Sequence, residues 1–154
     1  MSAMLADDEL LITRTFDASP ALMFSLWSDI QHFQKWMGPE GFDCPEMEMD
    51  FRVGGKYRGM IRSKDHGDNW FHGEYVEIDR PHRLVFTWRW EQGPAADTNT
   101  TITITFREEA DGRTTQIFHQ TPFTSVERRD SHVGGWNSLF NKLAAYAAQH
   151  QGKD

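Results

Sequence analysis

The residues that could do acid–base or metal chemistry are spread along the chain and do not form a compact motif. None of the seven histidines has another histidine four residues away, which is the helical spacing of a zinc-protease motif. The single cysteine, Cys44, excludes an intrachain disulfide and a cysteine-based zinc site. The sequence also has no phosphate-binding glycine loop and no nucleophile elbow. We therefore expect no metal site and no cofactor, and we assign no catalytic residue.

Three residues remain as weak candidates for an acid or base if the protein is an enzyme: His72, Glu74 and His119. Each of them would need to point into an interior cavity, because burial moves the pKa of a carboxyl or imidazole group toward a catalytic value. The sequence alone places none of the three inside. Catalysis therefore has no positive support from the residues.

Aromatic side chains form a second set, which could bind a ligand. Phe86, Trp88 and Trp90 alternate along one predicted strand, and Trp136 and Phe140 are four residues apart on a predicted helix. Such rings can line a pocket for a flat or lipid-like ligand as well as fill a core, and core packing is the alternative for each ring. We predict a ligand-binding site of seven aromatic residues: Trp36, Tyr57, Phe86, Trp88, Trp90, Trp136 and Phe140.

Glycine and arginine positions add two weaker signals. Gly59 would face inward, where it could leave space for a ligand or mark a β-bulge. Gly134 and Gly135 lie within a predicted helix, where each costs about 1 kcal/mol relative to alanine. They indicate either close approach of another element or a flexible point at a pocket mouth. Arg52 is interpreted as a structural anchor for a strand end, with an anchor for an acidic ligand group as the alternative.

The charge balance argues against partners with anionic surfaces. The chain carries 23 acidic and 16 basic residues, a formal net charge of −7, and such a surface repels nucleic acids and anionic membranes. No apolar stretch approaches the ~20 residues of a membrane span, and the N-terminus lacks a basic-then-apolar export signal. We expect a cytoplasmic protein with one domain over residues 9–149 and disordered ends at residues 1–8 and 150–154.

The elements that must position these residues begin with a strand over residues 10–16. Ser19 and Pro20 then give an N-cap and a first-turn proline for a short helix. Ser28 with Gln31 predicts a capping box for a second short helix. The two helices precede a long stretch of different periodicity.

From residue 42 to residue 121 the hydrophobic pattern has a period of two, which is typical of strands. The first of these strands is predicted from the alternation of Met47, Met49, Phe51 and Val53 with charged residues. Further strands are expected over residues 56–63, 69–79, 82–91, 100–107 and 113–121. On the last strand, the faces Ile117/His119 and Phe118/Gln120 are equally plausible as the inward face.

The last element is a long helix. Thr124 with Glu127 predicts its capping box, and one apolar stripe follows helical spacing: Val126, Val133, Trp136, Phe140, Leu143 and Ala147. The order is one strand, two short helices, six strands and one long helix. It indicates an α+β fold, an antiparallel sheet with helices packed on one face.

Several segments also stand in the order found in a known family. They are residues 14–20 (RTFDASP), 36–39 (WMGP), 50–57 (DFRVGGKY), 73–74 (GE), 83–88 (RLVFTW), 120–127 and 135–136 (GW). Over roughly residues 10–148 the chain resembles the homologues of the C-terminal domain of the activator of the heat-shock protein 90 ATPase. That family belongs to the START, Bet v 1 and polyketide-cyclase-like (SRPBCC) superfamily.

The resemblance implies a helix-grip fold, in which a curved antiparallel sheet of about seven strands wraps a long C-terminal helix and encloses a hydrophobic cavity. It implies binding of a small hydrophobic or aromatic molecule, lipid-like, polyketide-like or xenobiotic, in that cavity. A cyclase or hydrolase that uses the same cavity is one alternative, because members of this superfamily differ in task. A chaperone-linked or stress-related interaction module, with chaperone contact by family analogy only, and a homodimer are the others.

Overall fold

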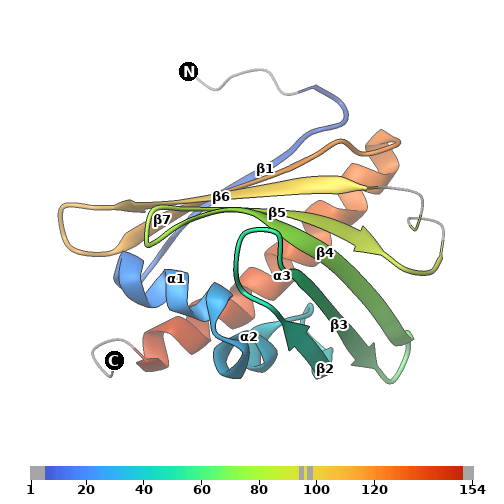
Figure 1. Ribbon diagram of the computed structural model, residues 1–154, viewed down its shortest axis with the longest axis horizontal. Coiled ribbons are helices and arrows are strands. Elements are labelled where there is room, and N and C mark those ends of the chain that lie inside the picture. Colours follow the sequence, from blue (N-terminus) through green and yellow to red (C-terminus); the bar gives the residue numbers. More distant parts are fainter. Residues whose placement is uncertain (1–5, 94–95, 97–98, 151–154) are drawn as a thin grey trace.

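The computed structural model describes residues 6–93, 96 and 99–150 (Figure 1). Its elements, in chain order, are β1 (Leu10–Phe16), α1 (Pro20–Ser28), α2 (Ile30–Trp36), β2 (Asp43–Met49), β3 (Lys56–Ser63), β4 (Gly67–Asp79), β5 (Arg83–Trp90), β6 (Thr100–Glu108), β7 (Thr114–Thr121) and α3 (Val126–His150). This order confirms the predicted strand, two short helices, six strands and long helix. No helix among these residues is both long and apolar enough to cross a membrane.

The strands form one antiparallel sheet in the order β1-β7-β6-β5-β4-β3-β2. The sheet curves, and α3 runs across one of its faces, with α1 and α2 between α3 and the neighbouring strands (Figure 1). The first strand returns to pair with the last, so that Leu10 lies opposite Gln120 and Phe16 opposite Thr114. The predicted α+β helix-grip fold is therefore confirmed.

In β7, the last strand in the sequence, one of the two candidate faces points inward. Phe118 and Gln120 are fully buried on the inner face, whereas Ile117 and His119 are partly exposed on the outer face. The Gln120 side chain is satisfied inside, because its Nε2 donates to Thr100 Oγ1 and its Oε1 accepts from Trp136 Nε1. A buried amide is tolerated when its hydrogen bonds are made, which explains a polar residue on the core face.

The prediction that β2 continues to Val53 is wrong. The strand ends at Met49, and the chain turns through residues 50–55, where the Gly55 amide donates to the Arg52 carbonyl at 2.8 Å. Val53 is 60% exposed. The turn needs glycine, because Gly54 has a φ of 83° and a Cβ on Gly55 would lie 1.9 Å from the Asp50 carbonyl oxygen.

Two of the predicted helix caps are displaced by one residue. The N-cap of α2 is Asp29, whose carboxylate accepts from the Gln31 amide, while the Ser28 hydroxyl donates to Phe24 O within α1. At α3, Ser125 Oγ accepts from the Arg128 amide at 3.1 Å. The predicted N-cap of α1 at Ser19 is confirmed, because its hydroxyl accepts from the Leu22 amide.

The buried face of α3 also differs slightly from the predicted stripe. Leu139 joins the core together with Trp136, Phe140, Leu143 and Ala147, whereas Val126 at the start of the helix is exposed. The predicted disordered segments 1–8 and 150–154 lie largely outside the described residues. Within them, Asp8 O accepts from the Phe123 amide and the Thr121 hydroxyl.

Candidate functional site

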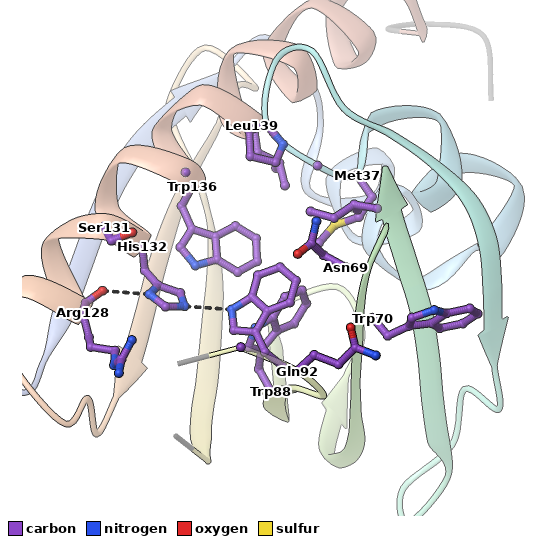
Figure 2. Close-up of a pocket in the computed structure, with 16 residues that line it drawn as sticks. Met37, Asn69, Trp70, Trp88, Gln92, Arg128, Ser131, His132, Trp136 and Leu139 are labelled. Atoms are coloured by element: carbon purple, nitrogen blue, oxygen red, sulfur yellow. Dashed lines mark hydrogen bonds between the residues drawn. The ribbon is translucent and has the colours of Figure 1, made fainter. Parts of the chain in front are cut away.

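A pocket of about 430 Å³ lies between the N-terminal half of α3, strands β3 to β5 and the segment that follows α2. Figure 2 shows side chains from all three parts facing the same space. The residues that line it are Met37, Gly38, Pro39, Ile61, Asn69, Trp70, Trp88, Trp90, Gln92, Gly93, Arg128, Ser131, His132, Gly135, Trp136 and Leu139. The sheet and the helix therefore leave space at one end of their contact.

Three of the seven predicted aromatic residues line this pocket, namely Trp88, Trp90 and Trp136. The Trp88 ring meets Trp136 at a centroid distance of 5.2 Å and Trp90 at 5.5 Å, both edge-to-face. Such contacts are the preferred geometry of aromatic pairs. The three indoles thus form one continuous wall, which strand β5 and helix α3 supply together.

The other four predicted residues lie in the core and do not line the pocket. Trp36 donates its indole N–H to Leu26 O at 3.0 Å, and Phe140 packs between Phe16 and Phe118. Phe86 is covered by neighbouring rings, including Tyr57 at 5.8 Å. These rings occupy interior volume that the predicted site would have left to a ligand.

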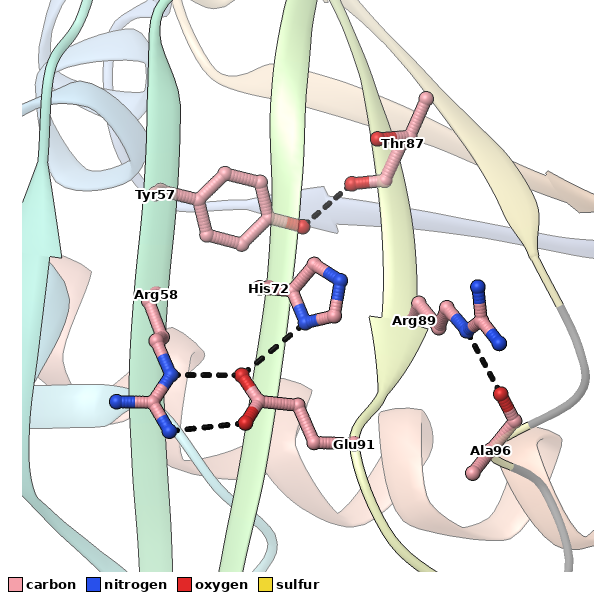
Figure 3. Close-up of polar contacts among 7 residues, drawn as sticks. All are labelled: Tyr57, Arg58, His72, Thr87, Arg89, Glu91 and Ala96. Carbon is pink, nitrogen blue, oxygen red and sulfur yellow. Dashed lines mark hydrogen bonds and ion pairs between the residues drawn. The ribbon is translucent and has the colours of Figure 1, made fainter.

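Tyr57 is a special case, because its hydroxyl fills a gap in the sheet. Its OH donates to Thr87 O at 2.5 Å across β4, where Gly73 has no side chain (Figure 3). A Cβ on Gly73 would lie 2.6 Å from the Tyr57 hydroxyl oxygen. Burial raises the pKa of Tyr57 well above its ordinary value, so the hydroxyl keeps the proton that it donates. Its role is structural.

The space predicted at Gly59 is occupied. Gly59 pairs with Phe71 across β3 and β4, and a Cβ there would lie 2.7 Å from Phe71 Cζ and 2.5 Å from Met47 Sδ. The Phe71 ring in turn stacks on Trp88 at 4.4 Å with an interplanar angle of 14°. The glycine therefore admits an aromatic ring that supports the pocket wall from behind.

The pocket contains one imidazole, His132, which the sequence analysis did not select. Its Nδ1 lies 2.8 Å from Arg128 O and its Nε2 lies 3.0 Å from Trp90 Nε1 (Figure 2). Because a carbonyl only accepts and an indole N–H only donates, Nδ1 carries the proton and Nε2 accepts. Burial lowers the pKa of His132, so the ring is neutral at physiological pH.

A helical spacing signal could have identified this face of α3. Arg128, His132 and Trp136 follow one another at intervals of four residues, and all three line the pocket. Residues four apart lie on the same face of a helix. Arg128 and His132 are polar, so they do not belong to the apolar stripe from which the buried face of this helix was predicted.

The two glycines of α3 have different environments. A Cβ on Gly134 would meet no atom within 4 Å, so close approach of another element does not explain this glycine. A Cβ on Gly135 would meet only Pro39 Cγ, at 3.9 Å, and Gly135 lines the pocket. A side chain at position 135 would therefore enter the pocket, whereas one at position 134 would enter solvent.

None of the three weak catalytic candidates lies at the pocket. His72 Nδ1 lies 3.1 Å from Glu91 Oε2, and Arg58 donates to both oxygens of the same carboxylate (Figure 3). This pairing, chiefly the hydrogen bond from Arg58, lowers the pKa of Glu91. His119 pairs with Glu9 at 2.9 Å. Glu74 is exposed.

The remaining polar groups either stabilise the fold or lie on the protein surface. Arg52 pairs with Asp50 in the exposed turn after β2, away from the pocket. Among the residues that the structure describes, no group of histidine, cysteine and carboxylate side chains is arranged to hold a metal ion.

Comparison with known proteins agrees with this architecture. The family model described as Activator of Hsp90 ATPase homolog 1-like protein matches residues 17–148. A solved structure from Chromobacterium violaceum shares 26% sequence identity with a TM-score of 0.81, covering 91% of this chain and 97% of that chain. The AHSA1 protein of Silicibacter pomeroyi shares 24% identity with a TM-score of 0.82, covering 93% and 99%. Comparison with curated proteins gives no match.

Proposed function

The chain belongs to the family of Activator of Hsp90 ATPase homolog 1-like proteins, and we propose that it binds a small hydrophobic or aromatic molecule in the pocket between α3 and the sheet. The fold commonly binds hydrophobic ligands. The observation that carries the proposal is the pocket itself, whose volume of about 430 Å³ falls within the range of small-molecule sites, roughly 300–1,000 Å³.

The composition of the pocket wall supports an apolar ligand. Besides the three indoles, aliphatic side chains and a proline line the pocket, namely Met37, Pro39, Ile61 and Leu139. Removing apolar surface from water contributes about 25 cal/mol per Å², and aromatic rings add geometric preference through stacking. A flat molecule could therefore gain most of its binding free energy from contacts with both walls.

Binding is better supported than catalysis at this pocket. A general base needs a free nitrogen or oxygen within hydrogen-bonding distance of the substrate. Both ring nitrogens of His132 are already engaged, one by Arg128 O and one by Trp90 Nε1. Only Nε2 could accept a proton from a substrate, and it would first have to break its hydrogen bond with the Trp90 indole N–H.

The two glycines of α3 give a matched test. We expect N-phenyl-1-naphthylamine, a neutral hydrophobic fluorophore, to bind the wild-type protein and the Gly134→Leu variant with similar Kd. Gly135→Leu should weaken binding about tenfold or more, because filling an occupied space costs 1–3 kcal/mol and 1.4 kcal/mol is a factor of ten. Fluorescence titration measures the three dissociation constants.

The two leucine variants gain the same helix propensity, about 1 kcal/mol over glycine. Thermal unfolding of both variants controls for folding. Equal affinity of the two variants, or no binding to the wild-type protein, contradicts the proposal.

A further inference from the structure

Arg128 stands apart from the other arginines of the chain because its guanidinium has no hydrogen-bond or ion-pair partner in the part of the chain that the structure describes. Its backbone is held, since the amide donates to Ser125 Oγ and the carbonyl accepts from His132. Its side chain makes no hydrogen bond or ion pair with any described residue. An arginine held at the backbone and free at its guanidinium is positioned to bind something else.

Every other arginine has a partner among the described residues. Seven form ion pairs with carboxylates: Arg52, Arg58, Arg62, Arg83, Arg107, Arg113 and Arg129. The other three donate to Asn141, Ser28 and Ala96 O: Arg14, Arg80 and Arg89. In a chain with a net charge of −7, where acidic partners are plentiful, an unpaired guanidinium is an exception.

The free guanidinium belongs to the pocket and gives it a single sign of charge. Among the described residues that line the space, Arg128 is the only one with a formal charge, given that His132 is neutral. The acidic residues nearest to it on α3, Glu127 and Asp130, do not line the pocket, and Asp130 pairs with Arg129. The positive end of the α3 dipole adds to the same potential, because Arg128 is in the first turn.

The rest of the polar lining is uncharged. Ser131 and Gln92 make no side-chain hydrogen bond with a described residue, and Asn69 uses only its amide nitrogen, toward His66 O and Gly67 O. Figure 2 shows Arg128, Ser131 and His132 on α3 at one side of the pocket, opposite Asn69. The pocket thus has an apolar, tryptophan-lined part and a positively charged rim.

We infer that the ligand of this pocket is a hydrophobic organic acid, whose apolar body lies against the tryptophans and whose carboxylate or sulfonate group pairs with Arg128. A planar guanidinium presents parallel N–H donors that match the two oxygens of such an acid group. The inference rests on the proposed binding function and adds the chemical class of the ligand.

A matched pair of probes separates this inference from the proposed function. 8-Anilino-1-naphthalenesulfonate carries the aromatic body of N-phenyl-1-naphthylamine plus one anionic group. Each probe is titrated against the wild-type protein, Arg128→Gln and Arg129→Gln. Glutamine has nearly the helix propensity of arginine, and Arg129, adjacent in sequence but paired with Asp130, is the control for loss of one positive charge.

We expect Arg128→Gln to weaken binding of the anionic probe about tenfold, because it removes a charge-assisted hydrogen bond. The same variant should change the Kd of the neutral probe by no more than about twofold. Arg129→Gln should change the Kd of both probes by no more than about twofold, because Arg129 does not line the pocket and is already paired with Asp130. Gly135→Leu should weaken both probes.

Three other results overturn the inference in distinguishable ways. If both probes bind, Gly135→Leu weakens both and Arg128→Gln weakens neither, the pocket binds apolar molecules without selecting an acid. Equal losses of the anionic probe in Arg128→Gln and Arg129→Gln would show general attraction and no specific pairing. If Gly135→Leu has no effect on either probe, the proposed function fails and the inference fails with it.

Discussion

Two of the three pocket tryptophans, Trp90 and Trp136, are held in place by their indole N–H groups. Trp136 donates to the buried Gln120 side chain at 2.8 Å, and Trp90 donates to His132 at 3.0 Å. A ring fixed at both its apolar body and its N–H loses little further freedom when a ligand binds, which favours affinity. Trp88, whose Nε1 has no hydrogen-bond partner among the described residues, is held by stacking on Phe71.

His132 makes the stability of this arrangement dependent on pH. Its pKa in the folded protein is lowered by burial, and the nearby Arg128 charge acts in the same direction. The unfolded chain therefore binds more protons than the folded one below about pH 6.5, the ordinary histidine pKa. The stability that neutral His132 contributes is fully present above that pH and is lost as the pH falls toward its folded pKa.

We accordingly expect the free energy of unfolding of the wild-type protein to fall more steeply between pH 6.5 and 5 than that of His132→Gln. Glutamine can accept from Trp90 and donate to Arg128 O without titrating. Urea denaturation of both proteins across this range measures the difference. Parallel pH profiles would show that His132 does not titrate differently on folding.

Residue types limited what the sequence could predict about the site. Trp88, Trp90 and Trp136 were selected as large inward rings, and they do line the pocket. The prediction also included Trp36 and Phe140, which lie on helices and fill the core, because the spacing of apolar residues gives a face but not the depth along that face. Arg128 was not selected because its importance lies in a missing partner, which only the arrangement of all other side chains reveals.

Elements were predicted more completely than side-chain roles. β1 and β3 were predicted with their observed bounds, and the other strands within two residues at most ends, because period-two alternation is strong where one face is wet. The exception is the end of β2, where Phe51 and Val53 continued the alternation through a turn that Gly54 and Gly55 impose. Here backbone sterics override the hydrophobic pattern.

Substitutions at the start of α2 test which residue is its N-cap. Asp29→Ala should lower the free energy of unfolding by about 1 kcal/mol, because it removes the acceptor for the Gln31 amide. Ser28→Ala should cost less, because the Ser28 hydroxyl donates to Phe24 O within α1 and otherwise accepts only an exposed hydrogen bond from Arg80. Urea denaturation of the two variants measures both changes. A larger loss for Ser28→Ala would support the cap predicted from the sequence over the observed one.

In the whole molecule, the sheet and α3 are packed closely against each other along much of their contact. Much of the space between sheet and helix is filled by buried rings, such as Trp27 against Phe118 and Phe140. The pocket remains only toward the N-terminal half of α3, where Gly135 and Gly38 contribute no side chains. Sequence patterns predicted the layers, but the volume left between them depends on how every ring packs.

The other expectations concern the partners and the location of the protein. A chaperone contact, a homodimer and a cytoplasmic location remain predictions from family analogy and composition. The edge strands of the sheet are β1 and β2, and an edge strand is where a second copy could extend the sheet.

The central claim, that an apolar molecule occupies the space between α3 and the sheet, is tested most directly by a crystal structure of the protein with N-phenyl-1-naphthylamine. We expect density for the naphthyl ring among Trp88, Trp90 and Trp136, with Gly135 at its edge. Density for the probe only on the outer face of the sheet, with the pocket closed by side chains or holding only water, would contradict it.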